Sequence, residues 1–240
     1  MNRYYDPADD DITFSIGCYK DYEMAEWCIS ELRKHYPSCF VHLISDGDDD
    51  IRYYDLVLKY RVTYIIGERL YPAQNGGALI HRILSHWAEV PTKYLIKIDT
   101  DTHVHRRFDS LPDEDCLFGS LQSGRNFGQS LQGGCLGMTR NAAYDLWYSE
   151  FFLDEKLKDY KATWAKNQTL IDRAEIQGLI GFEWVMAYVL KESGLPYPMI
   201  EEPEIRSEWR KPVENKDLKY AVTHPCQAKL DSLQKEKANS

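Results

Sequence analysis

The sequence predicts an α/β protein with a mostly parallel central sheet and helices on both faces. Short apolar runs of strand length alternate with longer stretches in which apolar residues recur at helical spacing. Polar and acidic clusters directly follow several of these runs, as residues do at the carboxyl ends of parallel strands. The chain has 240 residues, 43% of them hydrophobic, which is enough for one domain with a sizeable core.

The alternation is clearest in the first half of the chain. The expected elements are, in order, a strand, a helix, three strands, a helix and a strand at residues 12–16, 21–35, 40–44, 55–59, 62–66, 79–87 and 94–98. Asp21 is the expected helix N-cap, and Pro37 and Pro91 end the two helices. Since strands joined through helices run parallel, we expect their carboxyl ends to meet at one edge of the sheet.

The second half is less regular. The expected elements are a strand at 116–121, a polar Gly-rich loop at 123–134, a strand at 135–138, helices at 141–151 and 182–193, and a strand at 219–223. The charged segment 154–178 is ambiguous. No linker or repeat divides the chain. We therefore expect a single domain over 1–240, with halves at 1–115 and 116–226 and a polar tail at 227–240.

Composition narrows the class of protein. The formal net charge is −9 and no basic stripe occurs, which argues against a nucleic acid partner. The aromatic content of 13% suits a sugar-handling cleft, although core packing explains most of these rings. We expect no signal peptide and no integral membrane segment, because no apolar stretch is long enough. The six cysteines contain no CxxC pair and are expected to be free thiols in a cytoplasmic protein.

The most informative motif is Asp99-Thr100-Asp101, which closes the apolar run at 94–98. Side chains two apart on a strand point the same way, so two carboxylates lie together at a buried strand end. They repel each other unless a cation joins them, and a hard divalent ion held by carboxylates usually keeps positions open for phosphate oxygens. The motif therefore indicates a metal–diphosphate site. A solvated acidic turn is the alternative that such a short motif leaves open.

Five segments resemble, in order and spacing, the GT-A fold nucleotide-sugar glycosyltransferases, nearest to the family 2 pattern. They are Ile44-Ser45-Asp46-Gly47, Asn75-Gly76-Gly77 followed by Arg82, Asp99-Thr100-Asp101, Gly133-Gly134-Cys135-Leu136-Gly137 and Gly181-Phe182-Glu183. The resemblance covers about residues 12–195. It implies a Rossmann-like GT-A sheet with a smaller acceptor-side region. It also implies metal-dependent transfer of a sugar from a nucleoside-diphosphate sugar to a hydroxyl of a glycan, glycolipid or protein glycan.

The resemblance further implies roles for individual residues. Those assigned to the nucleotide-sugar donor are Gly17, Cys18, Tyr19, Asp46, Asn75, Arg82, Asp99, Thr100 and Asp101. Asp46 would accept a hydrogen bond from the base, and a UDP-sugar is favoured. The expected ligands of Mn²⁺ or Mg²⁺ are Asp99, Asp101 and His224, and an imidazole favours Mn²⁺. The acceptor would contact Gly133, Gly134 and Trp184. Glu183 would be the general base of an inverting displacement.

The chain also departs from the family pattern. Phe182 replaces the first acid of the G-E-D segment, and Glu183 stands where Asp is usual. The Q-x-x-R-W motif is absent, which argues against a processive synthase. Alternatives are a nucleotidyltransferase, whose Gly-rich basic loop after the first strand is missing, and a non-catalytic carbohydrate- or nucleotide-binding protein. A haloacid-dehalogenase-type phosphatase is disfavoured, because His103 stands where that signature has Thr or Val.

Overall fold

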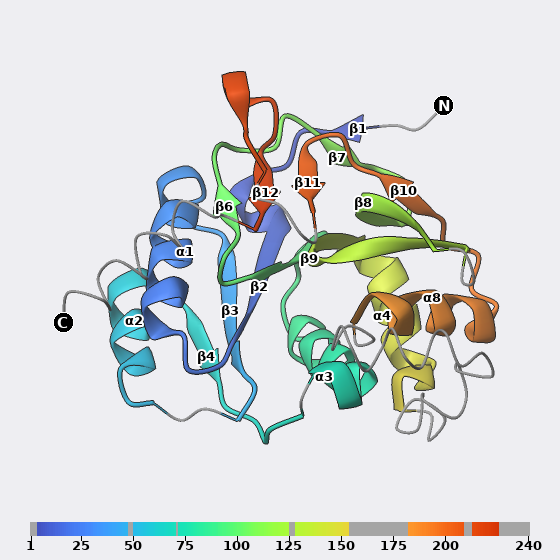
Figure 1. Ribbon diagram of the computed structural model, residues 1–240, viewed down its shortest axis with the longest axis horizontal. Helices are drawn as coiled ribbons and strands as arrows, with labels where there is room; N and C mark the ends of the chain where they lie inside the picture. The colour runs from blue at the N-terminus through green and yellow to red at the C-terminus, as the bar shows by residue number, and fades with distance from the viewer. Residues whose placement is uncertain are drawn as a thin grey trace.

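The computed structural model describes residues 4–47, 50–70, 72–124, 128–153, 182–208 and 213–225. In this part of the chain a seven-stranded sheet forms the centre of the protein (Figure 1). Its strands are, in spatial order, β10 (Met199–Glu201), β8 (Leu117–Gly124), β9 (Gly128–Thr139), β5 (Tyr94–Asp99), β2 (Ile12–Cys18), β3 (Phe40–Ser45) and β4 (Thr63–Ile65). Strand β9 runs antiparallel to both of its neighbours, and the other strand pairs are parallel. The expected α/β class with a mostly parallel sheet is confirmed.

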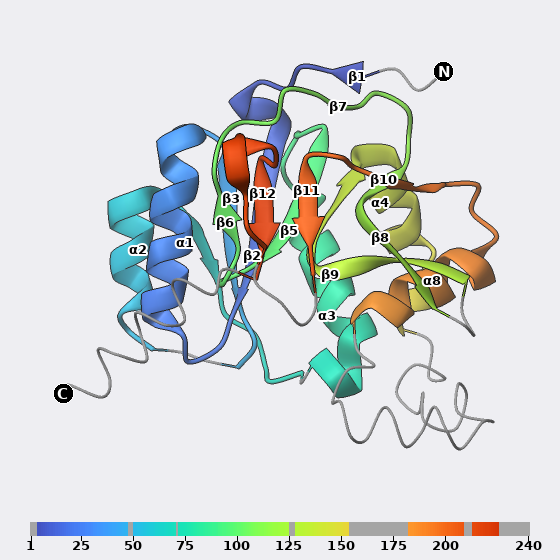
Figure 2. The ribbon, with the colours of Figure 1, turned by 45° about the horizontal axis from the view of Figure 1, so that its top comes forward.

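Helices cover both faces of this sheet. The described helices are α1 (Tyr22–His35), α2 (Tyr53–Tyr60), α3 (Pro72–Trp87), α4 (Arg140–Tyr148) and α8 (Phe182–Ser193). Helices α1 and α2 pack on one face, and α3, α4 and α8 pack on the other (Figures 1 and 2). No helix within the described ranges has the length and apolar character needed to cross a membrane.

The central strands are buried on both sides because each face has its own layer of helices. On β5, Tyr94, Ile96 and Ile98 belong to the core with α1 and α2, whereas Leu95 belongs to the core with α3 and α4. A strand covered on both faces reads as a continuous apolar run rather than an alternating one, which is why this run was recognisable in the sequence. Lys97 interrupts the run on the same side as Leu95 and is also buried.

The strand expected at 55–59 is wrong, because these residues belong to helix α2. Tyr53 and Leu56 are fully buried, and Val57 and Tyr60 pack against the same core. This spacing of three, four and seven residues is helical. The valine and the tyrosines favour a strand by composition, but the period of the buried positions decides the structure.

The polar loop expected at 123–134 is also wrong where the structure describes this segment, and residues 125–127 lie outside the described residues. Strands β8 and β9 form a hairpin that includes the pairs Ser123–Gln129 and Gln122–Ser130, so cross-strand hydrogen bonds order its polar residues. The late strand is β12 (Val222–His224), three residues later than the expected start. Asp21 stands at the N-cap position of α1, but its side chain makes no capping hydrogen bond. The ambiguous segment 154–178 and the tail at 227–240 lie outside the described residues.

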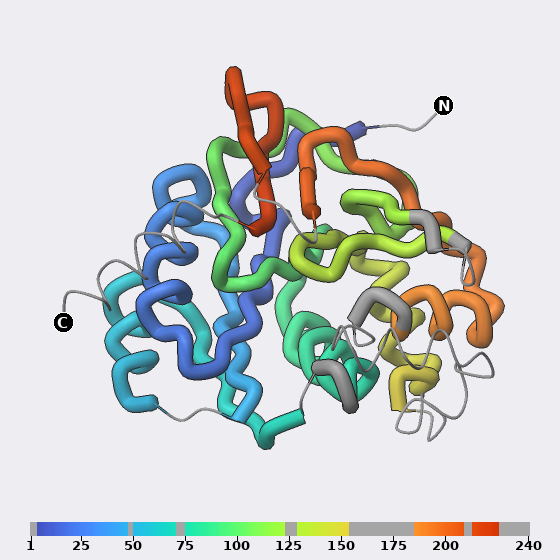
Figure 3. Tube along the Cα trace, in the orientation of Figure 1, coloured from blue at the N-terminus to red at the C-terminus, as the bar shows by residue number. Residues whose placement is uncertain are grey.

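A second, three-stranded sheet joins two late strands of the chain to a strand from its middle. Strand β12 lies between β11 (Ile205–Ser207), to which it is parallel, and β6 (His103–Val104), to which it is antiparallel. Figure 3 shows β12, in red, beside the green segment that contains β6. Because Thr223 pairs with His103, the next residue, His224, comes close to the turn that carries Asp99 and Asp101. A short two-stranded sheet joins β1 (Tyr4–Tyr5) to β7 (Leu111–Pro112).

Candidate metal centre and its surroundings

The turn that follows β5 is fixed by its own hydrogen bonds. The Thr102 backbone N–H donates to the Asp99 carbonyl at 3.1 Å, and the Asp99 N–H donates to Thr102 Oγ1 at 3.1 Å. Thr100 Oγ1 donates to the Asp21 carboxylate at 2.6 Å, which ties the turn to the start of α1. The middle residue of the motif therefore points away into the protein, and the carboxylates of Asp99 and Asp101 are left to face His224.

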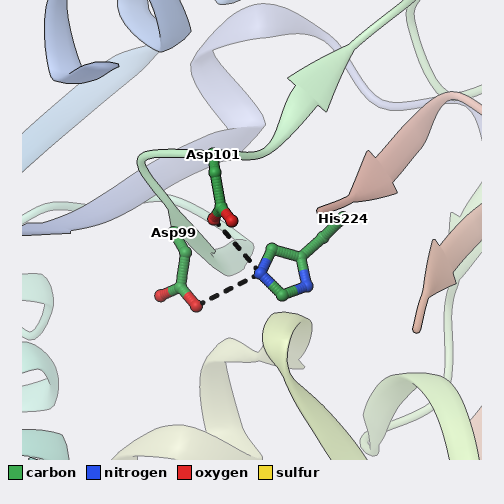
Figure 4. Close-up of side chains that lie close together, drawn as sticks. All are labelled: Asp99, Asp101 and His224. Carbon is green, nitrogen blue, oxygen red and sulfur yellow. Dashed lines mark ion pairs between the residues drawn. The ribbon is translucent and has the colours of Figure 1, made fainter. Parts of the chain in front are cut away.

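His224 completes a group of three ligand side chains (Figure 4). Its Nε2 atom lies 3.2 Å from Asp101 Oδ1 and 3.5 Å from Asp99 Oδ2. The other ring nitrogen, Nδ1, lies 3.0 Å from Ser207 Oγ on the neighbouring strand β11. This contact leaves Nε2 as the ring atom that faces the carboxylates, as is usual for metal-binding histidines. The structure thus brings together all three residues that were predicted as metal ligands.

The packing around His224 depends on a glycine. A Cβ atom added to Gly134 would lie 2.0 Å from His224 Nδ1, well inside any allowed contact. The imidazole therefore occupies the space that a side chain at 134 would fill. Neighbouring ligands of an octahedral ion with bonds of about 2.1 Å are ~3 Å apart. The separations of 3.2 and 3.5 Å between His224 Nε2 and the two carboxylate oxygens are close to this value, and one ligand atom from each residue lies within 4.8 Å of the others.

Electrostatics favour ionised carboxylates here. Burial acts to raise the pKa of Asp101, but the hydrogen bond and charge of His224, with a contribution from Lys97, bring its pKa below the ordinary value. Burial raises the pKa of Asp21, although hydrogen bonds from Thr100, Tyr19 and Tyr53 oppose this shift. The ionised form of Asp101, which a cation requires, is therefore favoured.

Lys97 is a site residue that the sequence analysis missed. Its ammonium group donates hydrogen bonds to Asp99 Oδ1 and, at 2.6 Å, to the Gly133 carbonyl. The side chain is only 9% exposed. A signal was present in the sequence, because a lysine inside a continuous apolar strand must find a buried partner, and Asp99 is two residues away on the same side.

The residues predicted to bind the base form a separate cluster at the ends of β2 and β3. Asp46 is nearly fully buried; its Oδ1 accepts a hydrogen bond from the Leu70 N–H at 2.6 Å, and its Oδ2 lies 3.0 Å from Arg69 Nη1. The Arg69 guanidinium stacks on Tyr19, with its central carbon 3.3 Å from the ring centroid. The sequence did not identify Arg69 as a residue of this cluster, because it lies in a segment with no helix or strand pattern that would place it.

Gly17 and Cys18 lie at the end of β2 beside this cluster. Gly17 pairs with Asp99 across the sheet, and a Cβ added to it would meet no atom within 4 Å. The space next to it is therefore open, on the strand that adjoins the metal ligands. The Cys18 thiol points the other way, into the core, and donates to the Ile44 carbonyl at 3.6 Å. Its backbone carbonyl accepts a hydrogen bond from the Asp46 N–H at 3.0 Å.

Arg82 and Asn75 hold the chain segment that carries Arg69. Arg82 donates to the carbonyls of Ser45 at 3.2 Å and Glu68 at 3.1 Å. Asn75 interrupts α3 with a non-helical backbone and donates to the Leu70 carbonyl at 2.7 Å. Both side chains therefore fix the backbone of the segment that carries Arg69. Their direct contact with a nucleotide stays a prediction.

The acceptor-side predictions have different outcomes. Gly133 and Gly134 are both buried. The Gly133 carbonyl accepts a hydrogen bond from Lys97, and Gly134 packs against the His224 ring, so both glycines contact residues of the candidate metal centre. Glu183 and Trp184 stand in the first turn of α8 as expected, but their side chains lie outside the described residues. Their roles stay predictions.

No model of a known protein family matches this chain, and a search among curated proteins gave no match. The function has therefore to be inferred from the site itself.

Proposed function

We propose that this protein is a metal-dependent glycosyltransferase that moves a sugar from a nucleoside-diphosphate sugar to a hydroxyl acceptor with inversion. The observation that carries the proposal is the convergence of Asp99, Asp101 and His224. His224 is far from the two aspartates in sequence, yet its Nε2 lies 3.2 and 3.5 Å from their carboxylate oxygens. Two carboxylates and an imidazole at the carboxyl end of a parallel strand suit a divalent ion that binds a diphosphate.

The ion would be held by Asp99, Asp101 and His224. When bound, Mn²⁺ or Mg²⁺ supplies positive charge that stabilises the leaving nucleoside diphosphate. The nitrogen ligand favours Mn²⁺ of the two. Ser207 orients the His224 ring, and Thr100 fixes the turn through Asp21, so the ligands are arranged before the ion arrives.

The donor base would bind beside Tyr19 and Asp46. An aromatic ring can stack on a base, and a buried carboxylate can accept its imide N–H. A carboxylate acceptor suits uracil, and we therefore favour a UDP-sugar over other donors. Arg82 and Asn75 support this cluster through the backbone carbonyls that they bind. The open space at Gly17 lies between this cluster and the metal ligands, where the ribose and diphosphate would fit.

Glu183 is the proposed general base. It would take the proton from the acceptor hydroxyl as that oxygen attacks the anomeric carbon from the face opposite the leaving group. The first turn of α8 favours the ionised carboxylate, because the helix N-terminus carries partial positive charge. Trp184 would stack on a glycan or glycolipid acceptor. We expect Glu183→Gln to keep donor affinity and lose transfer, measured as product formation against calorimetric donor binding. Retained transfer would remove Glu183 from this role.

Donor binding with and without metal tests the proposal. We would measure thermal shifts with UDP-, GDP-, dTDP- and CDP-sugars in the presence and absence of Mn²⁺. We expect one donor class to stabilise the protein only with the ion. Asp101→Ala should abolish that shift, whereas Asp113→Asn, which removes an exposed carboxylate paired with Lys93, should keep it.

Each other result points to a definite alternative. A shift with nucleoside triphosphates, accompanied by pyrophosphate release, would favour a nucleotidyltransferase. Binding of a nucleotide or sugar without turnover would favour a non-catalytic binding protein. No shift with any nucleotide, with or without Mn²⁺, would overturn the assignment of the aspartates. The cytoplasmic location stays a prediction of the sequence.

A further inference from the structure

Lys97 places a positive charge inside the candidate ion site, and the proposed function gives it no role. It lies on β5 two residues before Asp99, so alternation puts the two side chains on the same side of the strand. Its ammonium group donates to Asp99 Oδ1 and to the Gly133 carbonyl. Lys97 therefore connects a metal ligand on β5 to the backbone of β9, next to the glycine that makes room for His224.

The ammonium group changes what the site offers to an ion. Asp99 has one oxygen on Lys97 and presents the other, Oδ2, toward His224 Nε2 at 3.5 Å. The two carboxylates and the one ammonium group together carry a single net negative charge. A divalent ion entering this cluster meets less attraction than the two aspartates alone would supply.

We propose that Lys97 is a positioning residue of the ion site, which confines the ion to one oxygen of Asp99 and lowers the affinity of the protein for a divalent cation. The inference rests on the proposed function, because it takes Asp99, Asp101 and His224 as the ligands. An ion that is held weakly by the protein exchanges readily and depends on the phosphate oxygens of a ligand to retain it.

Two effects of removing Lys97 oppose each other, and the structure decides between them. Loss of the hydrogen bond would free the Asp99 carboxylate to move. Asp99 is 40% exposed, however, so water can replace Lys97 at Oδ1 and the cost is small. Lys97 is buried, so water and salt screen its charge only weakly. Its repulsion of the ion is therefore strong. The net result of removing the charge is tighter ion binding.

A titration with Mn²⁺ alone tests whether removing the charge of Lys97 tightens ion binding. The free ion is counted from its EPR signal as the purified full chain is added. Lys97→Gln removes the charge and keeps a donor for the Gly133 carbonyl, and we expect its Kd for Mn²⁺ to fall by about tenfold. Lys97→Arg keeps the charge and should retain the wild-type Kd. Lys93→Gln removes the same charge from a lysine that pairs with Asp113 at 2.6 Å, and it should leave the Kd unchanged.

The outcomes separate this inference from the proposed function. Lys97→Met serves as the uncharged variant if Lys97→Gln does not fold. Wild-type binding of Mn²⁺ with an equal or weaker affinity in the uncharged variant overturns the role of Lys97 and leaves the ion site standing. Failure of both the wild-type chain and the uncharged variant to bind Mn²⁺, with or without a nucleoside diphosphate present, refutes the ion site, and with it the proposed function.

Discussion

Replacing Gly134 with alanine should remove His224 from the metal centre without changing a ligand. The added Cβ would lie 2.0 Å from His224 Nδ1 and 2.1 Å from Cε1. Carbon and nitrogen atoms that are not bonded approach to about 3.4 Å, so the ring must move by roughly 1.4 Å. Metal sites hold their ligand distances within about 0.2 Å. The displaced imidazole can therefore no longer bind an ion shared with Asp99 and Asp101.

We expect Gly134→Ala to weaken Mn²⁺ binding by at least about tenfold. The Kd would be measured by the same EPR titration, on protein shown to be folded by circular dichroism. Overpacking should also lower the free energy of unfolding by about 1–3 kcal/mol. The urea midpoint reports this second effect independently of the ion.

Gly137→Ala is the matched control on the same strand. Its Cβ would lie 2.2 Å from the Phe118 ring and would overpack the core without touching His224. It should lose stability and keep its affinity for Mn²⁺. Folded Gly134→Ala that binds Mn²⁺ as tightly as the wild type would refute the reasoning, since His224 would then not be a ligand.

Two further predictions follow from individual contacts. Ser207→Ala removes the partner of His224 Nδ1 and should weaken Mn²⁺ binding by about tenfold in the same titration, whereas Ser207→Thr should not; equal affinities would show that packing alone orients the ring. Burial raises the pKa of Glu202 to about 7, and its Oε2 has no hydrogen-bond partner among the described residues. Since the unfolded carboxyl ionises near 4.5, this group costs stability as pH rises from 4.5 to 7. Glu202→Gln should therefore raise the unfolding free energy at pH 8 by about 1–3 kcal/mol but not at pH 4, and an equal urea-denaturation gain at both would contradict this.

The class of fold was readable from the sequence because it depends on local patterns. The strand at 94–98 is an apolar run broken only by Lys97, the strand at 12–16 carries apolar residues at positions 12, 14 and 16, and the helix over 182–193 is followed by Gly194, a typical helix stop. The same approach failed at 55–59, where composition favours a strand and the period of buried positions is helical. It failed again at 123–134, because the pairing of polar residues in a hairpin depends on the partner strand.

The candidate site also has a part that the sequence predicts and a part that depends on the tertiary structure. Asp99 and Asp101 were identified from the sequence, because two carboxylates at a strand end are a local feature with a physical consequence. The nearness of His224 to these carboxylates was decided by the pairing of β12 with β6, which joins residues that are far apart in the chain. The contacts of Ser207, Gly134 and Arg69 also arise only when segments that are distant in the sequence pack together. The sequence thus determined which groups can do chemistry, and the tertiary structure decided which of them meet, because non-local contacts are fixed by packing and not by local preference.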